Sequence, residues 1–247
     1  MMAEFTEALF SIFFIETLIN GLLLGGVLAL LSLGLNLIFG VIDVVWICYA
    51  EIIMLGMYTI FFLHVDGGMP LILAAACGVG VTTVLGWLTH RLVIGYLLQA
   101  APINQLLATG GLLFFFQGAA MVAFGIEFRN LGVSLGSLAV SEDIYLSWTR
   151  LLSFAIAAGV VVVLYQFLSR SYLGAAIRAI SQDREIMILM GVNTKKLYLL
   201  TSAIGGGLAG LAAALLALQY DVHPFIGLSF GPITFMVCVM GGLGNMV

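Results

Sequence analysis

Long stretches without a charged residue constrain this chain more than any other feature of its sequence. The 26 residues between Glu16 and Asp43 carry no charge, and a second uncharged stretch of 35 residues runs from Leu92 to Ile126. A helix needs about 20 apolar residues to cross a bilayer, where no water can satisfy a broken backbone. With 63% hydrophobic and 8% charged residues, the sequence predicts an all-α, polytopic membrane protein.

Charge and motif content exclude several classes of function. The formal net charge is −4, and no basic stripe runs along the chain, so no nucleic-acid partner is expected. The nucleotide-binding pattern GxxxxGK[ST] and the metalloprotease pattern HExxH are absent from the sequence. Cys48, Cys77 and Cys238 lie in apolar runs without CxxC spacing, which is typical of small hydrophobic residues. We therefore expect no catalytic residue, no metal and no cofactor in this chain, which is predicted not to be an enzyme.

Dividing the chain at its charges predicts about seven spans. They are expected at 17–42, 44–63, 71–90, 103–125, 151–168, 197–220 and 230–247. The residues before Pro102 are expected to lie along the membrane surface, because a proline favours a helix start there. Two GxxxG pairs are predicted to allow close helix contact rather than to bind a ligand. These pairs are Gly21 with Gly25 and Gly206 with Gly210.

The basic residues predict the orientation of these spans. Six of the eight lie on one side, namely Arg91, Arg170, Arg178, Arg184, Lys195 and Lys196. Arg129 and Arg150 lie on the other side. Because cytoplasmic loops carry the excess of Lys and Arg, the loops around 91 and 170–196 are predicted to face the cytoplasm. The N-terminus then lies outside, with the loops 64–70, 126–149 and 221–229.

The longest polar stretch of the inner side is predicted to contain a short helix. Ser181 is expected to cap it, with Asp183 and Glu185 in its first turn near the positive end of the helix dipole. Gly191 is expected to end the helix in a left-handed conformation, and Asn193 to cap the next span.

This short helix has one apolar face. Ile186, Leu189 and Met190 follow the i, i+3, i+4 spacing of a helix surface. Such a face either rests on lipid headgroups or docks into a groove of a partner protein.

Four segments resemble one family of transporters. RAISQDREIMILMGVNTKKLYLLTSAIGGGLAGLAAALLAL at 178–218 closely resembles a cytoplasmic loop and helix of permease subunits in branched-chain amino acid (LIV-type) ABC importers. NGLLLGGVLALLSLGLNLIFGVI at 20–42, MLGMY at 54–58 and VCVMGGLGNMV at 237–247 resemble the same family. The resemblance covers most of the chain from residue 17 onward.

The resemblance implies an architecture and a set of partners. It implies one permease domain over 1–247 with a cytoplasmic coupling segment at 171–196, and an eighth helix beyond Val247. It also implies a second related permease, two cytoplasmic subunits that bind ATP, an extracytoplasmic solute-binding protein and a bacterial or archaeal inner membrane. The residues that the family's coupling helix brings to the ATPase would be Arg178, Asp183, Glu185, Ile186, Leu189 and Gly191.

One departure from the family pattern marks a candidate substrate pathway. Relatives read roughly N-F-A-H-G-E-F before the MLG run, whereas this chain reads WICYAEI at 46–52, so that only Glu51 is retained. Glu51 either lines the pathway or bonds a partner helix, because acids inside spans face the bundle interior or water. Trp46 and Tyr49 are expected on one helical face, as a gate for an amino-acid-like or carboxylate solute or as part of the interfacial aromatic belt.

A stand-alone secondary transporter is the alternative function. It would be driven by protons through Glu51 and Asp43, although no internal repeat of the kind found in such proteins is evident in the sequence.

The orientation leads to a labelling prediction. In a cysteine-free background, we expect a membrane-impermeant thiol reagent applied to intact cells to label Ser141→Cys and to spare Ser181→Cys, because the positive-inside rule places residue 181 in the cytoplasm. The two sites are compared before and after permeabilisation, which should expose both. Labelling of position 181 with sparing of position 141 in intact cells would reverse the orientation.

Overall fold

The computed structural model describes residues 12–133, 136–141 and 144–244. Among them, six helical stretches are long and apolar enough to cross a membrane. The helices that form these stretches, alone or with a π-helical turn, are α2 (Ile12–Ile42), α3 (Tyr49–Phe61), α4 (Leu71–Thr89), α6 (Pro102–Phe124), α7 (Trp148–Arg170) and α10 (Thr194–Ala217). The other helices are α5 (Gly95–Leu97), α8 (Tyr172–Gln182), α9 (Arg184–Leu189) and α11 (Ile226–Gly241). The predicted polytopic helical membrane fold is confirmed.

Two long helices continue through π-helical turns. α3 runs into η1 (Phe62–Asp66), and α4 runs through η2 (His90–Ile94) into α5. The surface segment predicted at 92–101 is therefore mostly wrong, since residues up to Leu97 prolong the third span, which reaches from Leu71 to Leu97. A small antiparallel pair, β1 (Ser137–Ser141) and β2 (Ile144–Ser147), lies in the predicted outer loop between α6 and α7.

The seventh predicted span is displaced and short. α11 begins at Ile226 rather than near Phe230, and it ends at Gly241, before Gly242 with a positive φ of 93°. The first turn of α11 lies beside Glu51. Glu51 is ten residues before Phe61, the last residue of α3, which corresponds to about 15 Å along the helix axis. The chain after α10 thus folds back into the bundle, and α11 begins at membrane depth.

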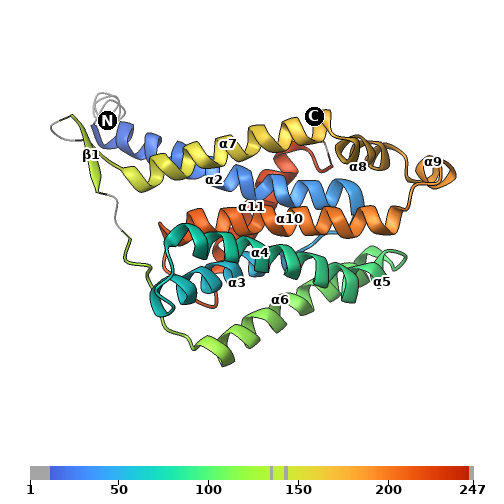
Figure 1. The fold of residues 1–247 in the computed structure, drawn as a ribbon, viewed down its shortest axis with the longest axis horizontal. Coiled ribbons are helices and arrows are strands. Elements are labelled where there is room, and N and C mark those ends of the chain that lie inside the picture. Colours follow the sequence, from blue (N-terminus) through green and yellow to red (C-terminus); the bar gives the residue numbers. More distant parts are fainter. Residues whose placement is uncertain (1–11, 134–135, 142–143, 245–247) are drawn as a thin grey trace, which may run out of the picture.

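The centre of the bundle is the contact of α10 with α4, α2 and α3, as Figure 1 shows for α10 and α4. A Cβ at Gly206 would lie 2.5 Å from the carbonyl oxygen of Thr82 and 3.1 Å from the Cα of Gly86. A Cβ at Gly210 would meet the Thr82 hydroxyl. The predicted close contact at this pair is confirmed, because glycine lets the two backbones approach.

The other GxxxG pair makes no such contact within this chain. A Cβ at Gly21 or Gly25 of α2 would meet no described atom within 4 Å. The prediction of close packing at this pair is therefore wrong for the isolated chain, because α2 turns this face away from its own bundle.

The loops predicted to face outward and those predicted to face the cytoplasm lie at opposite ends of the bundle. At one end, Arg129 and Val222 form an antiparallel backbone bridge, and the Arg129 guanidinium stacks over the rings of Phe61 and Phe62 at 5.6 and 5.0 Å. This end also holds β1 and lies opposite α5, α8 and α9 in Figure 1. Nearby, burial lowers the pKa of the His223 imidazole, against a smaller opposing effect of the Asp221 charge.

The α4–α10 contact predicts where a single methyl group is not tolerated. We expect Gly206→Ala to lower the free energy of unfolding by about 1–3 kcal/mol, because the added Cβ meets backbone atoms that have no room to shift. Gly25→Ala is the matched control and should be neutral or slightly stabilising, since alanine favours a helix. Thermal unfolding of the purified chain in detergent measures both, and an equal loss in the two variants would contradict the packing described here.

Candidate functional site

The chain between α2 and α3 forms a short break in helical structure that connects the first two spans. α2 stops at Asp43, which has a positive φ of 60°, a left-handed conformation that aspartate tolerates better than most residues. Residues 44–48 are not helical, so the second span begins at Tyr49 and not near Val44 as predicted. Val44, Trp46 and Cys48 are nevertheless buried. Irregular backbone is tolerated at membrane depth only when protein covers it.

Side chains from two elements satisfy this irregular backbone. The hydroxyl of Thr109 donates to the carbonyl oxygen of Val45 at 3.1 Å, from a position seven residues, or about 10 Å, into α6. The indole Nε1 of Trp46 donates to the Sγ of Cys48 at 2.8 Å. Trp46 therefore precedes α3 and does not share a helical face with Tyr49, which corrects that prediction.

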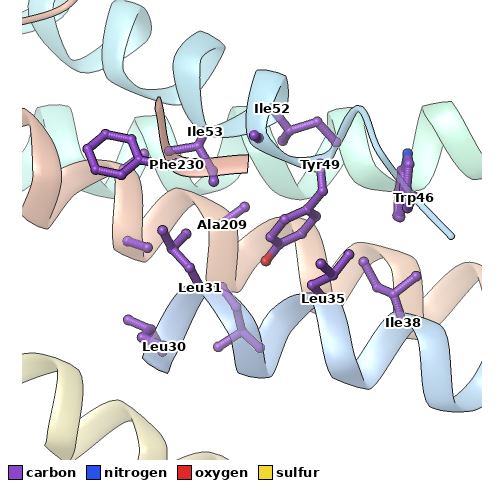
Figure 2. Close-up of a cluster of buried hydrophobic side chains, with 14 of the residues drawn as sticks. Leu30, Leu31, Leu35, Ile38, Trp46, Tyr49, Ile52, Ile53, Ala209 and Phe230 are labelled. Carbon is purple, nitrogen blue, oxygen red and sulfur yellow. The ribbon is translucent and has the colours of Figure 1, made fainter. Parts of the chain in front are cut away.

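Tyr49 joins the start of α3 to two other helices. Its hydroxyl donates to the carbonyl oxygen of Gly205 on α10 at 3.0 Å and fills the space that a Cβ would occupy at Gly34 on α2. Figure 2 shows the ring pointing from α3 into the cluster of α2 leucines, which include Leu31 and Leu35. The ring is buried in protein, so Tyr49 is not part of a lipid-facing aromatic belt.

Glu51 is fully buried at the meeting point of three helices. Its Oε1 accepts a hydrogen bond from the Nε2 of Gln117 on α6 at 3.0 Å. Its Oε2 has no hydrogen-bond partner among the described residues. A Cβ at Gly227, in the first turn of α11, would lie 2.5 Å from Oε1. The carboxyl group thus holds α3, α6 and the start of α11 together.

A cavity of about 520 Å³ lies between α2, the break, α6 and α11. Trp46, Tyr49 and Ala50 line one wall, and Gly227 lies on another, so that the cavity borders Glu51 without Glu51 lining it. The remaining lining residues are largely apolar: Leu35, Val45, Ile47, Leu106, Leu113, Leu228, Gly231, Pro232, Thr234 and Phe235. Thr234 contributes a buried hydroxyl that has no partner in the described part of the chain. The walls suit the apolar portion of a small solute.

The predicted coupling segment forms two helices rather than one. Ser171 caps α8 by accepting from the Gly174 amide at 2.9 Å. Asp183 caps α9 by accepting from the Ile186 amide at 3.0 Å. Ser181 lies inside α8 and donates to the carbonyl oxygen of Arg178, so its predicted capping role is wrong, since the carboxylate two residues later takes that position.

The structure also places the other residues singled out in this segment. Gly191 ends α9 with a positive φ of 78°, and the Asn193 side chain caps α10 by accepting from the Lys196 amide at 3.1 Å, as predicted. The guanidinium of Arg178 donates to the carbonyl oxygen of Leu168, in the last turn of α7. The side chain of Glu185 lies outside the described part of the structure.

The apolar face predicted on this segment is exposed. Leu189 is 86% exposed, and Ile186, Ile188 and Met190 are also exposed, whereas Met187 is buried. These side chains extend from the same end of the bundle as α5, where Figure 1 places α8 and α9. An apolar face of this kind is typical of an interaction site.

Comparison with known proteins decides the family. The family model described as "Branched-chain amino acid transport system / permease component" matches residues 17–247. The chain belongs to this family. The predicted ABC importer permease is confirmed, and the alternative of a stand-alone secondary transporter is not favoured.

Individual relatives agree with the family match. The chain is 30% identical over 247 residues to the high-affinity branched-chain amino acid transport system permease protein BraD of Pseudomonas aeruginosa, covering 94% of this chain and 80% of that protein. It is 26% identical over 249 residues to the corresponding protein LivH of Escherichia coli, covering 95% and 81%. A putative glucose ABC transporter permease protein, TsgC13 of Haloferax volcanii, is 31% identical over 160 residues, covering 63% of this chain and 48% of that protein. No solved structure matches the chain significantly.

Several residues of this permease site carry no strong signal in the sequence. Gln117 was detectable as a polar side chain inside the uncharged stretch 92–126, where each polar group needs a partner. Thr109, Gly227 and Thr234 are residue types common in spans, and only the fold brings them to the break and the cavity. In the described residues, no three His, Cys, Asp or Glu side chains gather as a metal site would require.

The contact of Glu51 with Gly227 predicts a non-additive effect. We expect Gly227→Ala to lower the free energy of unfolding by about 1–3 kcal/mol, because the new Cβ overlaps the Glu51 carboxyl group. In a Glu51→Ala background the same change should cost little, since the carboxyl group is gone. Thermal unfolding of the four proteins measures the coupling.

Gly231→Ala is the matched control one turn further along α11, where a Cβ would meet the Ala50 Cβ at 3.3 Å. Its effect should be smaller and the same with or without Glu51. If Gly227→Ala cost as much without the carboxyl group as with it, Glu51 would not be the group that requires a glycine there.

Proposed function

We propose that this permease carries amino acids across a bacterial or archaeal inner membrane as half of a two-permease core. In this proposal the other half is a related permease, and an extracytoplasmic binding protein delivers the solute. Two cytoplasmic subunits bind and hydrolyse ATP, and this chain holds no cofactor. Support comes from the relatives BraD and LivH, whose names assign them to branched-chain amino acid transport.

The exposed apolar face of α9 is the observation that carries the coupling role. Leu189 and its exposed neighbours lie on the side that the excess of basic residues assigns to the cytoplasm. A face of this kind on a surface helix favours docking into a groove of a partner protein. We assign the ATPase contact to 171–196, with Arg178, Asp183, Ile186 and Gly191 shaping the segment.

The pathway is assigned to the cavity beside the break. Trp46 and Tyr49 form part of its wall, and Glu51 supports that wall from behind through Gly227 and Ala50. The apolar lining favours solutes with an aliphatic or aromatic side chain over sugars, whose hydroxyl groups would lose their hydrogen bonds there. ATP-driven closure of the cytoplasmic subunits would change the affinity of this path for solute, which is how a transporter is driven between states.

A charge on the exposed face of α9 tests the coupling role. We expect Leu189→Asp to reduce recovery of the ATPase subunits with the permease by about tenfold or more, because burying a leucine contributes about 1.5–3 kcal/mol and a buried unpaired carboxylate costs more. ATP-dependent uptake of leucine, isoleucine and valine into proteoliposomes should fall with it. Recovery of the subunits on the tagged permease and uptake of labelled solute are measured together.

Leu189→Met is the control, because it keeps an apolar side chain of similar size. It should leave assembly and uptake near the wild-type level. Undiminished recovery of the ATPase subunits on Leu189→Asp would remove α9 from the interface. Solute uptake by the chain without ATPase subunits would favour the secondary transporter instead.

A further inference from the structure

Arg184 links the coupling segment to the end of α2. Its guanidinium Nη2 donates to the carbonyl oxygen of Ile42 at 3.0 Å and lies 3.4 Å from that of Val41. These are the last two carbonyls of α2, where a helix has no backbone donors left to satisfy them. A positive charge is also favourable at this negative end of the helix dipole. The first residue of α9 therefore caps a span 142 residues earlier in the chain.

The capped residues border the break that leads to the cavity. Asp43, which follows Ile42, has the positive φ that ends α2, and residues 44–48 then run to Tyr49 without helical structure. Trp46, in the middle of this run, lines the cavity of about 520 Å³. A shift of the α2 end thus moves the residues that carry one wall of the proposed pathway.

Arg184 also contacts a second helix. Its guanidinium lies 5.4 Å from the centre of the Tyr198 ring, in the first turns of α10. A cation over an aromatic face is attracted by the ring, and a planar guanidinium stacks and donates hydrogen bonds at the same time. One side chain therefore fixes α9 to both α2 and α10.

A second cavity lies beside Arg184 and the end of α2. It measures about 370 Å³ and is lined by Arg184, Asp43, Ser181, Gln182 and residues 243–244, among others. Its walls are mostly polar, so water can fill it and replace hydrogen bonds as they break. The contacts of Arg184 with α2 and α10 can therefore rearrange without separating the packed helices at the centre of the bundle.

The neighbouring arginine of the segment is attached elsewhere. Arg178 donates to the carbonyl oxygen of Leu168 at the end of α7, and α7 continues into α8 through one residue, Ser171. Its bond therefore stays within consecutive elements. Arg184 makes the long-range bond, which reaches the helix end that precedes the break.

We propose that Arg184 is the positioning residue that transmits movement of the coupling segment to the break at 43–48. This inference rests on the proposed ATPase contact of 171–196 and adds the route by which that contact reaches the pathway. When the ATPase subunits move α9, the guanidinium pulls the last turn of α2, and Trp46 and Ile47 shift at the cavity wall. Arg184 touches no solute and no nucleotide in this scheme.

The test measures the accessibility of a residue in the cavity wall while the complex is assembled. Ile47→Cys is placed in a permease whose native cysteines are replaced, and its rate of labelling by a small thiol reagent is measured with and without ATP and vanadate. With Arg184 present, we expect trapping by vanadate to change this rate by about tenfold, which corresponds to the loss or gain of a hydrogen bond from a charged donor. With Arg184→Ala, the rate should change less than about twofold, although the ATPase subunits stay bound.

Two variants separate transmission from a general loss of structure. Arg184→Lys keeps the positive charge and a nitrogen that donates hydrogen bonds, and it should recover most of the labelling response. Arg170→Ala removes an exposed arginine at the end of α7 and should leave the response unchanged. Recovery of the ATPase subunits is measured for every variant.

Each other outcome has a defined meaning. A full labelling response in Arg184→Ala overturns the inference, and so does loss of the ATPase subunits in that variant alone, because Arg184 would then be a docking residue. Failure of the ATPase subunits to bind the permease with Arg184 intact contradicts the proposed function itself. An equal loss of response in Arg170→Ala would show that inner-face charge, and not the bond to α2, is responsible.

Discussion

The need to satisfy every backbone polar group inside the membrane controls this structure. A helix break costs several kcal/mol unless protein groups replace the lost hydrogen bonds. At 43–48, Thr109 supplies one donor from α6, and Arg184 supplies another at the last carbonyls of α2. Side chains of α6 and α9 therefore meet at one discontinuity, and three of its residues, Val45, Trp46 and Ile47, line the cavity.

The spans could be predicted well because hydropathy identifies the segments that are apolar enough to lie in the hydrocarbon of a bilayer. Uncharged length placed α4, α6 and α7 within about three residues of their observed first residues, since charges and prolines mark where a chain leaves the hydrocarbon. The start of α3 could not be predicted in this way. Val44 and Trp46 are as apolar as helical residues, and hydropathy does not distinguish a helix from irregular backbone that protein covers. The same limit applies to α11, which begins at membrane depth.

The candidate site could be predicted only in part. Glu51 was recognisable because an ionisable side chain in a span requires a special environment. Its partners, Gln117 and Gly227, lie 66 and 176 residues further along the chain, and no spacing rule connects them to it. Arg184 entered the sequence argument only as one of six inner positive charges. Its role depends on reaching a helix end that sequence does not place nearby.

The Tyr49 hydroxyl occupies the place of a side chain at Gly34 and bonds the carbonyl oxygen of Gly205. Tyr49 and Gly34 belong to different helices, yet the tyrosine hydroxyl and a side chain at position 34 would share a single volume. Substitution at either position is therefore conditional on the other. A homologue with a smaller residue in place of Tyr49 gains room for a side chain at position 34, and once that room is filled, return to tyrosine is blocked. Divergence within the family is thus expected to change positions 49 and 34 in that order, and the pair of replacements is difficult to reverse.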